Sequence, residues 1–227
     1  MFDFLFGTSA RCKHLLPDGM DMHSHILPGV DDGSPDEETS LAIIRQLIKS
    51  GLTGACCTPH IMLRYPGNTP EHLRQRFASL QHDVDQRFGT GTFRLHLAAE
   101  YMIDDGFEAA LRAEQGPLTL PGKRILMELP QYLLPDGWMD SLLSVKELGF
   151  TPILAHPERY LRILDIDDLL GIVAHGIQLQ GNIGSLTGFY GRAVQQRAKE
   201  IHTRNLYTLW GTDAHSPSMA RQLRLKP

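Results

Sequence analysis

The alternation of short apolar segments with longer segments of helical periodicity is the feature that most constrains the fold of this chain. Seven strand-plus-helix units follow one another, and this regular order predicts parallel strands covered by helices. Seven units in 227 residues favour a barrel-like α/β fold over a doubly wound sheet. The first strand ends at His25, and the others are expected at residues 52–58, 93–100, 124–128, 151–155, 177–180 and 206–210.

The first two helices have recognisable start signals. Ser34, Pro35 and Glu37 predict a capping box with Ser34 as the N-cap, and Gly51 predicts the end of that helix. The sequence Thr69-Pro70-Glu71 predicts the start of a second helix that extends to about residue 88. Further helices are expected at residues 106–115, 138–148, 166–175 and 189–204.

The bulk composition excludes several classes of protein. The net charge of −4 argues against a broad nucleic-acid-binding surface. The three cysteines, Cys12, Cys56 and Cys57, form no disulfide framework, so a cytoplasmic location is expected. The sequence has no apolar stretch of about 18 residues, the length that a membrane span needs. Residues 1–18 are expected to be a lead-in whose aromatic cluster docks on a single domain, residues 19–227.

The stretch Asp21-Met22-His23-Ser24-His25 ends the first strand with two histidines at positions i and i+2. In extended backbone, these side chains point to the same face together with Asp21. Pro28-Gly29 and Asp31-Asp32-Gly33 then predict a turn in a loop that carries carboxylates. Neutral imidazole is the commonest metal ligand, so the pattern indicates a divalent-metal site. The alternative is a pair of histidines on a solvated strand end.

Ligand-type residues also lie at the ends of the other predicted strands. In a βα barrel the strand ends form one rim, where the active site lies. Strand six supplies Gln180 and Asn182 there, and nearly every other strand supplies an imidazole or a carboxylate, which packing explains poorly. Five imidazoles and four carboxylates without a thiolate suit two or three ions of Mn²⁺, Fe or Zn²⁺. The candidate metal ligands are His23, His25, Asp32, His60, Glu100, Glu128, His156, Asp213 and His215.

The motifs Asp-x-His-Ser-His…Asp-Asp-Gly, Thr-Pro-His, Ala-Glu, His-Pro-Glu-Arg and Thr-Asp-Ala-His, in this order, resemble the polymerase and histidinol phosphatase (PHP) superfamily. Residues 19–217 are most similar to its bacterial tyrosine-protein phosphatases of capsule and exopolysaccharide synthesis. The resemblance implies a distorted, TIM-like (β/α)7 barrel that binds three divalent ions, with Mn²⁺ the expected metal. It also implies the choice of Asp32 over Asp31. The implied groups are His23, His25, Glu100 and Asp213; Glu100, Glu128 and His156; and Asp32, His60 and His215.

The resemblance implies hydrolysis of phosphotyrosine on a tyrosine autokinase of polysaccharide biosynthesis. Arg159, three residues after His156, would bind the phosphate, for which its planar guanidinium is suited. Three divalent ions, four carboxylates and a bridging hydroxide would leave the cluster at about +1, which attracts a phosphate dianion. A metal-bound water with its pKa lowered toward about 7 would be the nucleophile. Tyrosine, with a pKa of about 10, needs little protonation as a leaving group.

Two other functions stay open at this point. A small-molecule phosphomonoesterase such as histidinol phosphatase would use the same site, as would a nuclease, although the acidic balance weighs against a nuclease. A non-catalytic regulator of the kinase would use the metals only to hold its fold. A cysteine-based phosphatase is excluded, because the arginine position of a Cys-x₅-Arg loop holds Leu63, Met62 or Asp18.

Several residues near these motifs have more than one interpretation. Arg64 and Tyr65 follow His60 and are candidates for substrate contact, although an exposed loop is the simpler interpretation. Asp21 either orients a histidine or is a plain strand-end carboxylate. Glu158 is expected at the surface or in a pair. The chain ends at residue 227, where members of the family usually continue for another helix.

Overall fold

The structure is a computed structural model that describes residues 15–16 and 18–222. Most of the expected lead-in, including Cys12, lies outside the described residues. All nine described strands pair in parallel. They form two sheets, with the orders β1-β2-β4 and β3-β5-β6-β7-β8-β9. The strands are β1 (Met20–Ser24), β2 (Gly54–Cys57), β3 (His60–Ile61), β4 (Arg94–Leu97), β5 (Glu100–Met102), β6 (Arg124–Glu128), β7 (Thr151–Ala155), β8 (Gln178–Asn182) and β9 (Tyr207–Gly211).

Two of the seven predicted strands are each divided into two short strands. Only residues 58–59 separate β2 from β3, and only residues 98–99 separate β4 from β5. Backbone hydrogen bonds continue through both interruptions, from Ala98 N to Cys57 O at 2.9 Å and from Glu100 N to Pro59 O at 3.0 Å. Pro59 has no N–H, so the ladder cannot run unbroken there. The interruption places Glu100 at the start of a strand in the larger sheet.

The first and last strands meet through a single bridge rather than a ladder. Ser24 pairs with Ala214, and Asp213 N donates to His23 O at 2.7 Å. A Cβ at Gly211 would lie 2.8 Å from His23 N, so only glycine allows this approach. The parallel α/β fold is therefore confirmed. The closed barrel is not, because the described strands form two separate sheets.

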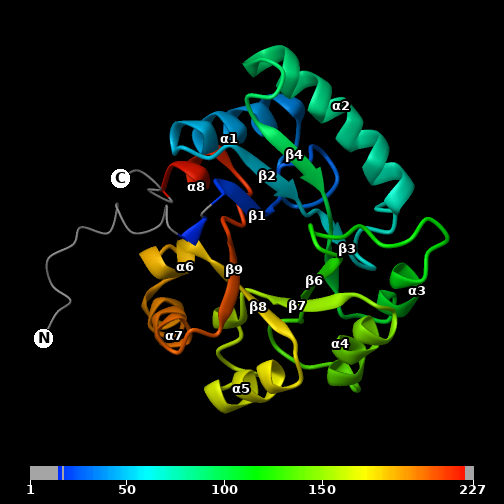
Figure 1. Cartoon of the computed structure of the whole chain (residues 1–227), viewed down its shortest axis with the longest axis vertical. Coiled ribbons are helices and arrows are strands. Elements are labelled where there is room, and N and C mark those ends of the chain that lie inside the picture. The colour runs from blue at the N-terminus through cyan, green and yellow to red at the C-terminus, as the bar shows by residue number, and fades with distance from the viewer. Residues whose placement is uncertain (1–14, 17, 223–227) are drawn as a thin grey trace, which may run out of the picture.

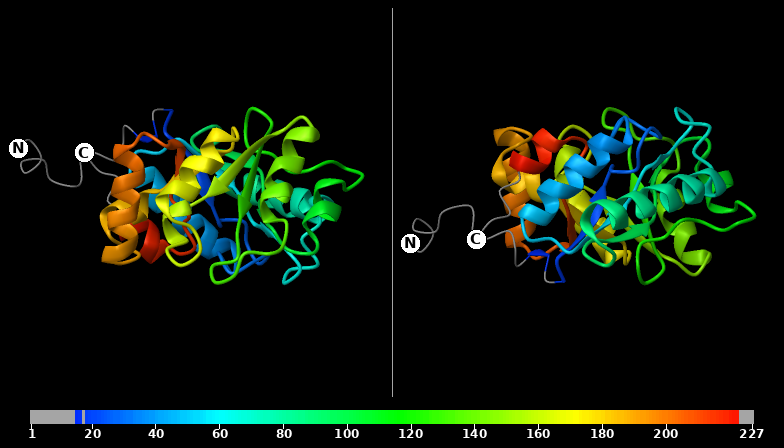
Figure 2. Two further views of the ribbon diagram at one scale, coloured as in Figure 1. Left: turned by 90° about the horizontal axis from the view of Figure 1, so that it is seen from below. Right: turned by 90° about the horizontal axis from the view of Figure 1, so that it is seen from above.

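The helices lie on the outside of the strands (Figures 1 and 2). α8 packs against α1, beside the junction of β1 and β9 (Figure 1). In the described part of the chain, no helix is both long and apolar enough to cross a membrane. The helices are α1 (Glu37–Lys49), α2 (Pro70–Phe88), α3 (Phe107–Leu111), α4 (Trp138–Glu147), α5 (Ile166–Ala174), α6 (Ile183–Thr187), α7 (Arg192–Thr203) and α8 (Pro217–Gln222), with a 3₁₀ turn at Pro157–Arg159.

Two helix starts differ from the prediction. Asp36, not Ser34, is the N-cap of α1, since its carboxylate accepts a hydrogen bond from Thr39 N at 2.8 Å. The predicted start of α2 is confirmed, because Thr69 caps that helix. α7 begins at Arg192 rather than at residue 189, because Gly191 at φ +93° separates it from the preceding turn.

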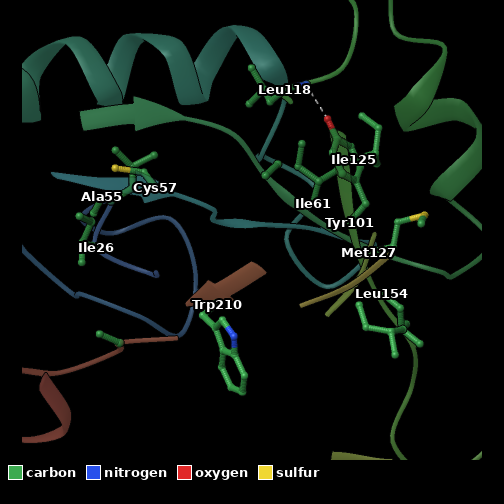
Figure 3. Close-up of a cluster of buried hydrophobic side chains, with 14 of the residues drawn as sticks. Ile26, Ala55, Cys57, Ile61, Tyr101, Leu118, Ile125, Met127, Leu154 and Trp210 are labelled. Atoms are coloured by element: carbon green, nitrogen blue, oxygen red, sulfur yellow. Dashed lines mark hydrogen bonds between the residues drawn. The ribbon is translucent and has the colours of Figure 1, made fainter. Parts of the chain in front are cut away.

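The apolar residues fill both faces of the strands. Ile125 and Met127 belong to the large cluster beneath the helices, whereas Leu126 belongs to a smaller cluster on the opposite face. Figure 3 shows part of the large cluster, in which the buried hydroxyl of Tyr101 accepts a hydrogen bond from Leu118 N at 2.8 Å. Cys57 is also buried in this cluster, as its predicted packing role requires.

Candidate metal centre

His23 in β1 and His25, the residue directly after β1, have fully buried imidazoles that face each other. Their Nε2 atoms lie 3.1 Å apart, and each is 3.2 Å from Glu100 Oε2. Asp213 Oδ1 lies 3.5 Å from the first and 3.4 Å from the second. Burial alone would lower the pKa of His23, but Glu100 and Asp213 raise it to about 9. This position therefore attracts positive charge.

The two aspartates of the loop after β1 have different positions. Asp31 Oδ2 lies 2.9 Å from His25 Nδ1, and the same carboxylate accepts hydrogen bonds from Gly33 N and His60 N. Asp32 is half exposed, and its Oδ1 lies 3.5 Å from His60 Nε2 and 3.7 Å from His215 Nε2. Asp31 thus fixes the His25 ring, while Asp32 faces His60 and His215, and the choice of Asp32 as a metal ligand stays a prediction.

Glu100 lies at the centre of the cluster. One oxygen contacts the two β1 histidines and lies 3.4 Å from His60 Nδ1, and the other lies 3.0 Å from His156 Nε2. Glu128 lies beside it, with one oxygen 3.8 Å from His60 Nδ1 and the other 3.6 Å from His156 Nε2. Burial and the charge of Glu100 raise the pKa of Glu128 to about 8. Two adjacent buried carboxylates are favourable only with positive charge between them.

His60 and His156 complete this side of the cluster as neutral imidazoles. Burial lowers the pKa of His60, and burial together with Arg159 lowers that of His156 to about 4. The Nδ1 atoms of both rings are buried without a hydrogen-bond partner among the described residues. His156 also has φ +31°, a rare value for a residue with a side chain. Neutral rings with free nitrogens are what metal ligation requires.

Asp213 and His215 come from the loop after β9. Asp213 has φ +54°, and its Oδ2 accepts hydrogen bonds from Arg159 Nη1 at 3.1 Å, Asn182 Nδ2 at 2.8 Å and the Tyr190 hydroxyl at 3.2 Å. The other oxygen, Oδ1, faces the β1 histidines. His215 stacks on His25 with ring centroids 4.1 Å apart. Strained backbone that directs a side chain into a site is characteristic of functional positions.

Gln180 and Asn182 of β8 connect two of these side chains through their amides. Gln180 Oε1 lies 2.8 Å from His23 Nδ1, so this nitrogen keeps its proton when the ring is neutral, and Nε2 would then offer its lone pair to a cation. Gln180 Nε2 donates to Asn182 Oδ1 at 2.9 Å, and Asn182 donates in turn to Asp213. Both amides are fully buried. We refer to this chain, His23–Gln180–Asn182–Asp213, as the amide relay.

Arg159 lies at the edge of the cluster, on the 3₁₀ turn, with 23% of its side chain exposed. The Tyr190 ring lies 5.3 Å from its guanidinium carbon, and no sequence pattern distinguishes Tyr190 from other loop aromatics. Glu158, expected at the surface or in a pair, is fully buried and is bound by hydrogen-bond donors. Its carboxylate accepts from Asn182 N and from the Tyr207 hydroxyl, each at 2.9 Å, which fixes the 3₁₀ turn on β8 and β9.

Tyr65 and Arg64 lie on the loop after β3. The Tyr65 ring is nearly parallel to that of His60, with centroids 6.1 Å apart. Arg64 is exposed, and its guanidinium lies over the same tyrosine ring. Asp21 lies behind the cluster, where it accepts hydrogen bonds from His23 N and from the backbone N–H and hydroxyl of Thr212. Asp21 therefore holds β1 against the loop after β9.

The ligand-type atoms form three groups, in each of which all members lie within 4.8 Å of one another. The arrangement differs from the predicted sharing in three respects. His25 joins the third group, His60 takes the place of His156 in the second, and Asp213 is not in the first. The groups are His25, Asp32, His60 and His215; His23, His25 and Glu100; and His60, Glu100 and Glu128. A mixed set of imidazoles and carboxylates without thiolates fits Mn²⁺, Fe or Zn²⁺.

Comparison with known proteins gives consistent results. The sequence profile described as "Capsular polysaccharide synthesis, CpsB/CapC" matches residues 19–226. Tyrosine-protein phosphatase YwqE of Bacillus subtilis is 28% identical over 200 residues, covering 87% of this chain and 77% of the relative. Tyrosine-protein phosphatase CpsB of Streptococcus agalactiae is 33% identical over 147 residues, covering 62% of this chain and 57% of the relative.

A solved structure supports the same relationship. It comes from a study of YwqE from Bacillus subtilis and CpsB from Streptococcus pneumoniae, described there as unique metal-dependent tyrosine phosphatases. The match has a TM-score of 0.81 and 26% identity, and it covers 91% of this chain and 84% of the other. The similarity therefore extends over almost the whole fold, including the strands that carry the cluster.

Proposed function

The chain belongs to the CpsB/CapC family of capsular polysaccharide synthesis, and from this premise we propose that it is a metal-dependent protein-tyrosine phosphatase. The observation that carries the proposal is the convergence of nine imidazole and carboxylate side chains beside one partly exposed arginine. The cluster collects cations, and Arg159 offers a guanidinium to a phosphate at its edge. This combination is what phosphate-ester hydrolysis requires.

We propose three divalent ions, with Mn²⁺ the preferred metal and Fe or Zn²⁺ as alternatives. His23, His25, Glu100 and Asp213 would hold the first, Glu100, Glu128 and His156 the second, and Asp32, His60 and His215 the third. The close groups of side chains differ from this sharing, since His25 also lies with the third group, while Asp213 and His156 contact the cluster through His23 and Glu100. When bound, such ions supply Lewis-acid activation of water and of the phosphate oxygens.

The exposed edge of the cluster indicates where the phosphate enters. Asp32 is half exposed and His215 and Arg159 are partly exposed, whereas His23, His25 and Glu100 are buried. Arg159 uses Nη1 for Asp213, so its remaining N–H groups would be available to a phosphate at that edge. Tyr190 holds the guanidinium from one side through its ring and its hydroxyl. The arginine is thus positioned before the substrate arrives.

We propose phosphotyrosine as the substrate, carried by a tyrosine autokinase of polysaccharide biosynthesis, in the cytoplasm. A phenolic leaving group needs little proton donation, and the described cluster presents no separate acid at its exposed edge. The runner-up substrate is a small phosphomonoester such as histidinol phosphate.

We also infer that the two sheets are arcs of one distorted seven-stranded barrel, because the interrupted strands continue from one sheet into the other.

The test is hydrolysis of a phosphotyrosyl peptide by the purified protein with Mn²⁺, compared with histidinol phosphate. We expect peptide hydrolysis that a chelator abolishes and that the His25→Ala variant lacks. His82→Ala is the matched control, because His82 is exposed on α2 and outside the cluster. A protein that binds metal but hydrolyses neither substrate would be a non-catalytic regulator, and the proposal would be wrong.

A further inference from the structure

A cavity of about 510 Å³ lies beside the metal centre, between the loop after β3 and the region of α3. Its volume falls within the range of roughly 300–1,000 Å³ that is typical of ligand pockets. Asp104, Glu114 and a few other polar residues complete a lining that is mainly apolar. The apolar side chains include those of Ile61, Met62, Leu63, Pro66, Ala109 and Ala113.

The wall of this cavity is formed in advance by hydrogen bonds within the protein. One oxygen of Asp104 accepts from Leu63 N at 2.8 Å, and the other accepts from Gly106 N at 2.9 Å. A Cβ at Gly106 would lie 3.0 Å from a methyl carbon of Leu63, so the two loops are in close contact. Both carboxylate oxygens of Asp104 serve this wall, which makes the carboxylate part of the scaffold.

The cavity and the metal centre share structural parts. Tyr65 lines the cavity and lies nearly parallel to the His60 ring, so one aromatic ring separates the two sites. Ile61 follows His60 directly in β3. Asn68 also lines the cavity, and its amide donates to His60 O at 2.7 Å and to Val30 O at 2.9 Å. The cavity is therefore adjacent to the cluster, within reach of a peptide whose phosphate lies there.

We propose that the cavity is a subsite for an apolar side chain close in sequence to the phosphotyrosine of the substrate peptide. The inference rests on the proposed function and names the substrate more closely. Leu63 is 59% exposed at the rim of the cavity. An aliphatic or aromatic side chain of the peptide would cover Leu63, and this contact would remove the apolar surface of both side chains from water, which favours binding. A charged side chain would lose its hydration among Ile61, Met62 and Ala113, so the lining selects against it.

The test uses two phosphotyrosyl peptides that differ only in one flanking residue, Leu or Ser, with each flanking position scanned in turn. Free phosphotyrosine serves as the substrate without flanking residues. The first variant is Ala109→Phe, which places a ring at the cavity from an exposed position. Ala78→Phe is its control, because Ala78 is an exposed alanine of α2 that does not line the cavity. Leu63→Ser is a second variant, and it should fold normally because the Leu63 side chain is exposed.

We expect wild type and Ala78→Phe to prefer the Leu peptide by about tenfold in kcat/KM at one flanking position. Ala109→Phe and Leu63→Ser should lose most of this preference through KM, and both should hydrolyse free phosphotyrosine at the wild-type rate. Equal rates on both peptides with wild type would overturn the subsite while leaving the phosphatase intact. Failure to hydrolyse any phosphotyrosyl substrate would instead overturn the proposed function. A concentration-dependent dimer lost in Ala109→Phe would assign the cavity to a second copy of the chain.

Discussion

Replacing Gln180 with methionine tests whether the amide relay sets the geometry of the first metal-binding group. The amide oxygen of Gln180 accepts from His23 Nδ1 at 2.8 Å, and its nitrogen donates to Asn182 Oδ1 at 2.9 Å. Methionine has a similar length and fills the same buried space, but it replaces neither hydrogen bond. The His23 ring would then lose the acceptor that keeps its proton on Nδ1 and leaves Nε2 free for a cation.

The expected loss follows from these contacts. Removing the hydrogen-bond partner of a ligating histidine typically lowers metal affinity about 10–100-fold. The metal-free protein should also lose about 2–6 kcal/mol of unfolding free energy, since His23 Nδ1 and Asn182 Oδ1 would each be buried without a partner, at about 1–3 kcal/mol apiece. The loss of metal affinity and the loss of stability are therefore measured separately.

The assay is calorimetric titration of Mn²⁺ into chelator-treated protein, with urea unfolding of the same samples. Gln178→Met is the matched control, because Gln178 belongs to the same strand, is partly exposed and has an amide oxygen with no partner in the described structure. The control should bind Mn²⁺ as the wild type does. Equal affinities for the Gln180 and Gln178 variants, within about twofold, would refute the reasoning, even if the first were less stable.

Three further predictions concern charge, metal and pH. Arg159→Lys should lower kcat on a phosphotyrosyl peptide by about 10²–10³-fold with metal content unchanged, because an ammonium group lacks the planar guanidinium that can bind Asp213 and a phosphate at once. Loss of metal in this variant would contradict a phosphate-binding role. Mn²⁺ at about 100 times its Kd should stabilise the chelated protein by at least about 2.7 kcal/mol, the value for a single site, or by at least about 5–10 °C in Tm, and an unchanged Tm would contradict a metal centre. Burial raises the pKa of Asp21 to about 6 from its ordinary 3.8, so its contribution to stability is full below about pH 4 and is lost as the pH rises through 6. In metal-free protein, the unfolding free energy of wild type relative to Asp21→Asn should therefore fall by about 3 kcal/mol between pH 4 and 7, and parallel urea-unfolding profiles would show that Asp21 does not titrate in this way.

The strand order could be predicted from the sequence because each strand is a short apolar run followed by a helical pattern. The strands at 124–128 and 151–155 agree to the residue with β6 and β7. The interruptions after β2 and β4 were not predicted, since Pro59 and the pair Ala98-Ala99 continue the apolar pattern while the ladder changes partners. The predicted start of α1 is wrong because Ser34 and Asp36 are both good caps, and the Ser34 hydroxyl donates to Asp36 O instead of accepting from the helix backbone.

The candidate ligands could be predicted because each lies at the end of a strand, where the fold itself brings the side chains together. The residues that support these ligands could not be predicted from the sequence. Glu158 looks like a surface residue in the sequence, and its burial depends on Asn182 and Tyr207 from two other strands. Tyr190 lies in a turn between two glycines and has no periodic pattern around it. Contacts of this kind depend on the three-dimensional path of loops, which local patterns do not encode.

The junction between β1 and β9 also determines when the site can exist. His23 and His25 are made long before Asp213 and His215, and β1 meets the loop after β9 through the Ser24–Ala214 bridge and the hydrogen bond from Asp213 N to His23 O. The proposed first group would therefore be complete only after Asp213 has been made and its loop has folded back onto β1. Bound ions would connect β1 to the loop after β9, which are far apart in the sequence. Release of the ions and separation of these two segments would therefore be coupled.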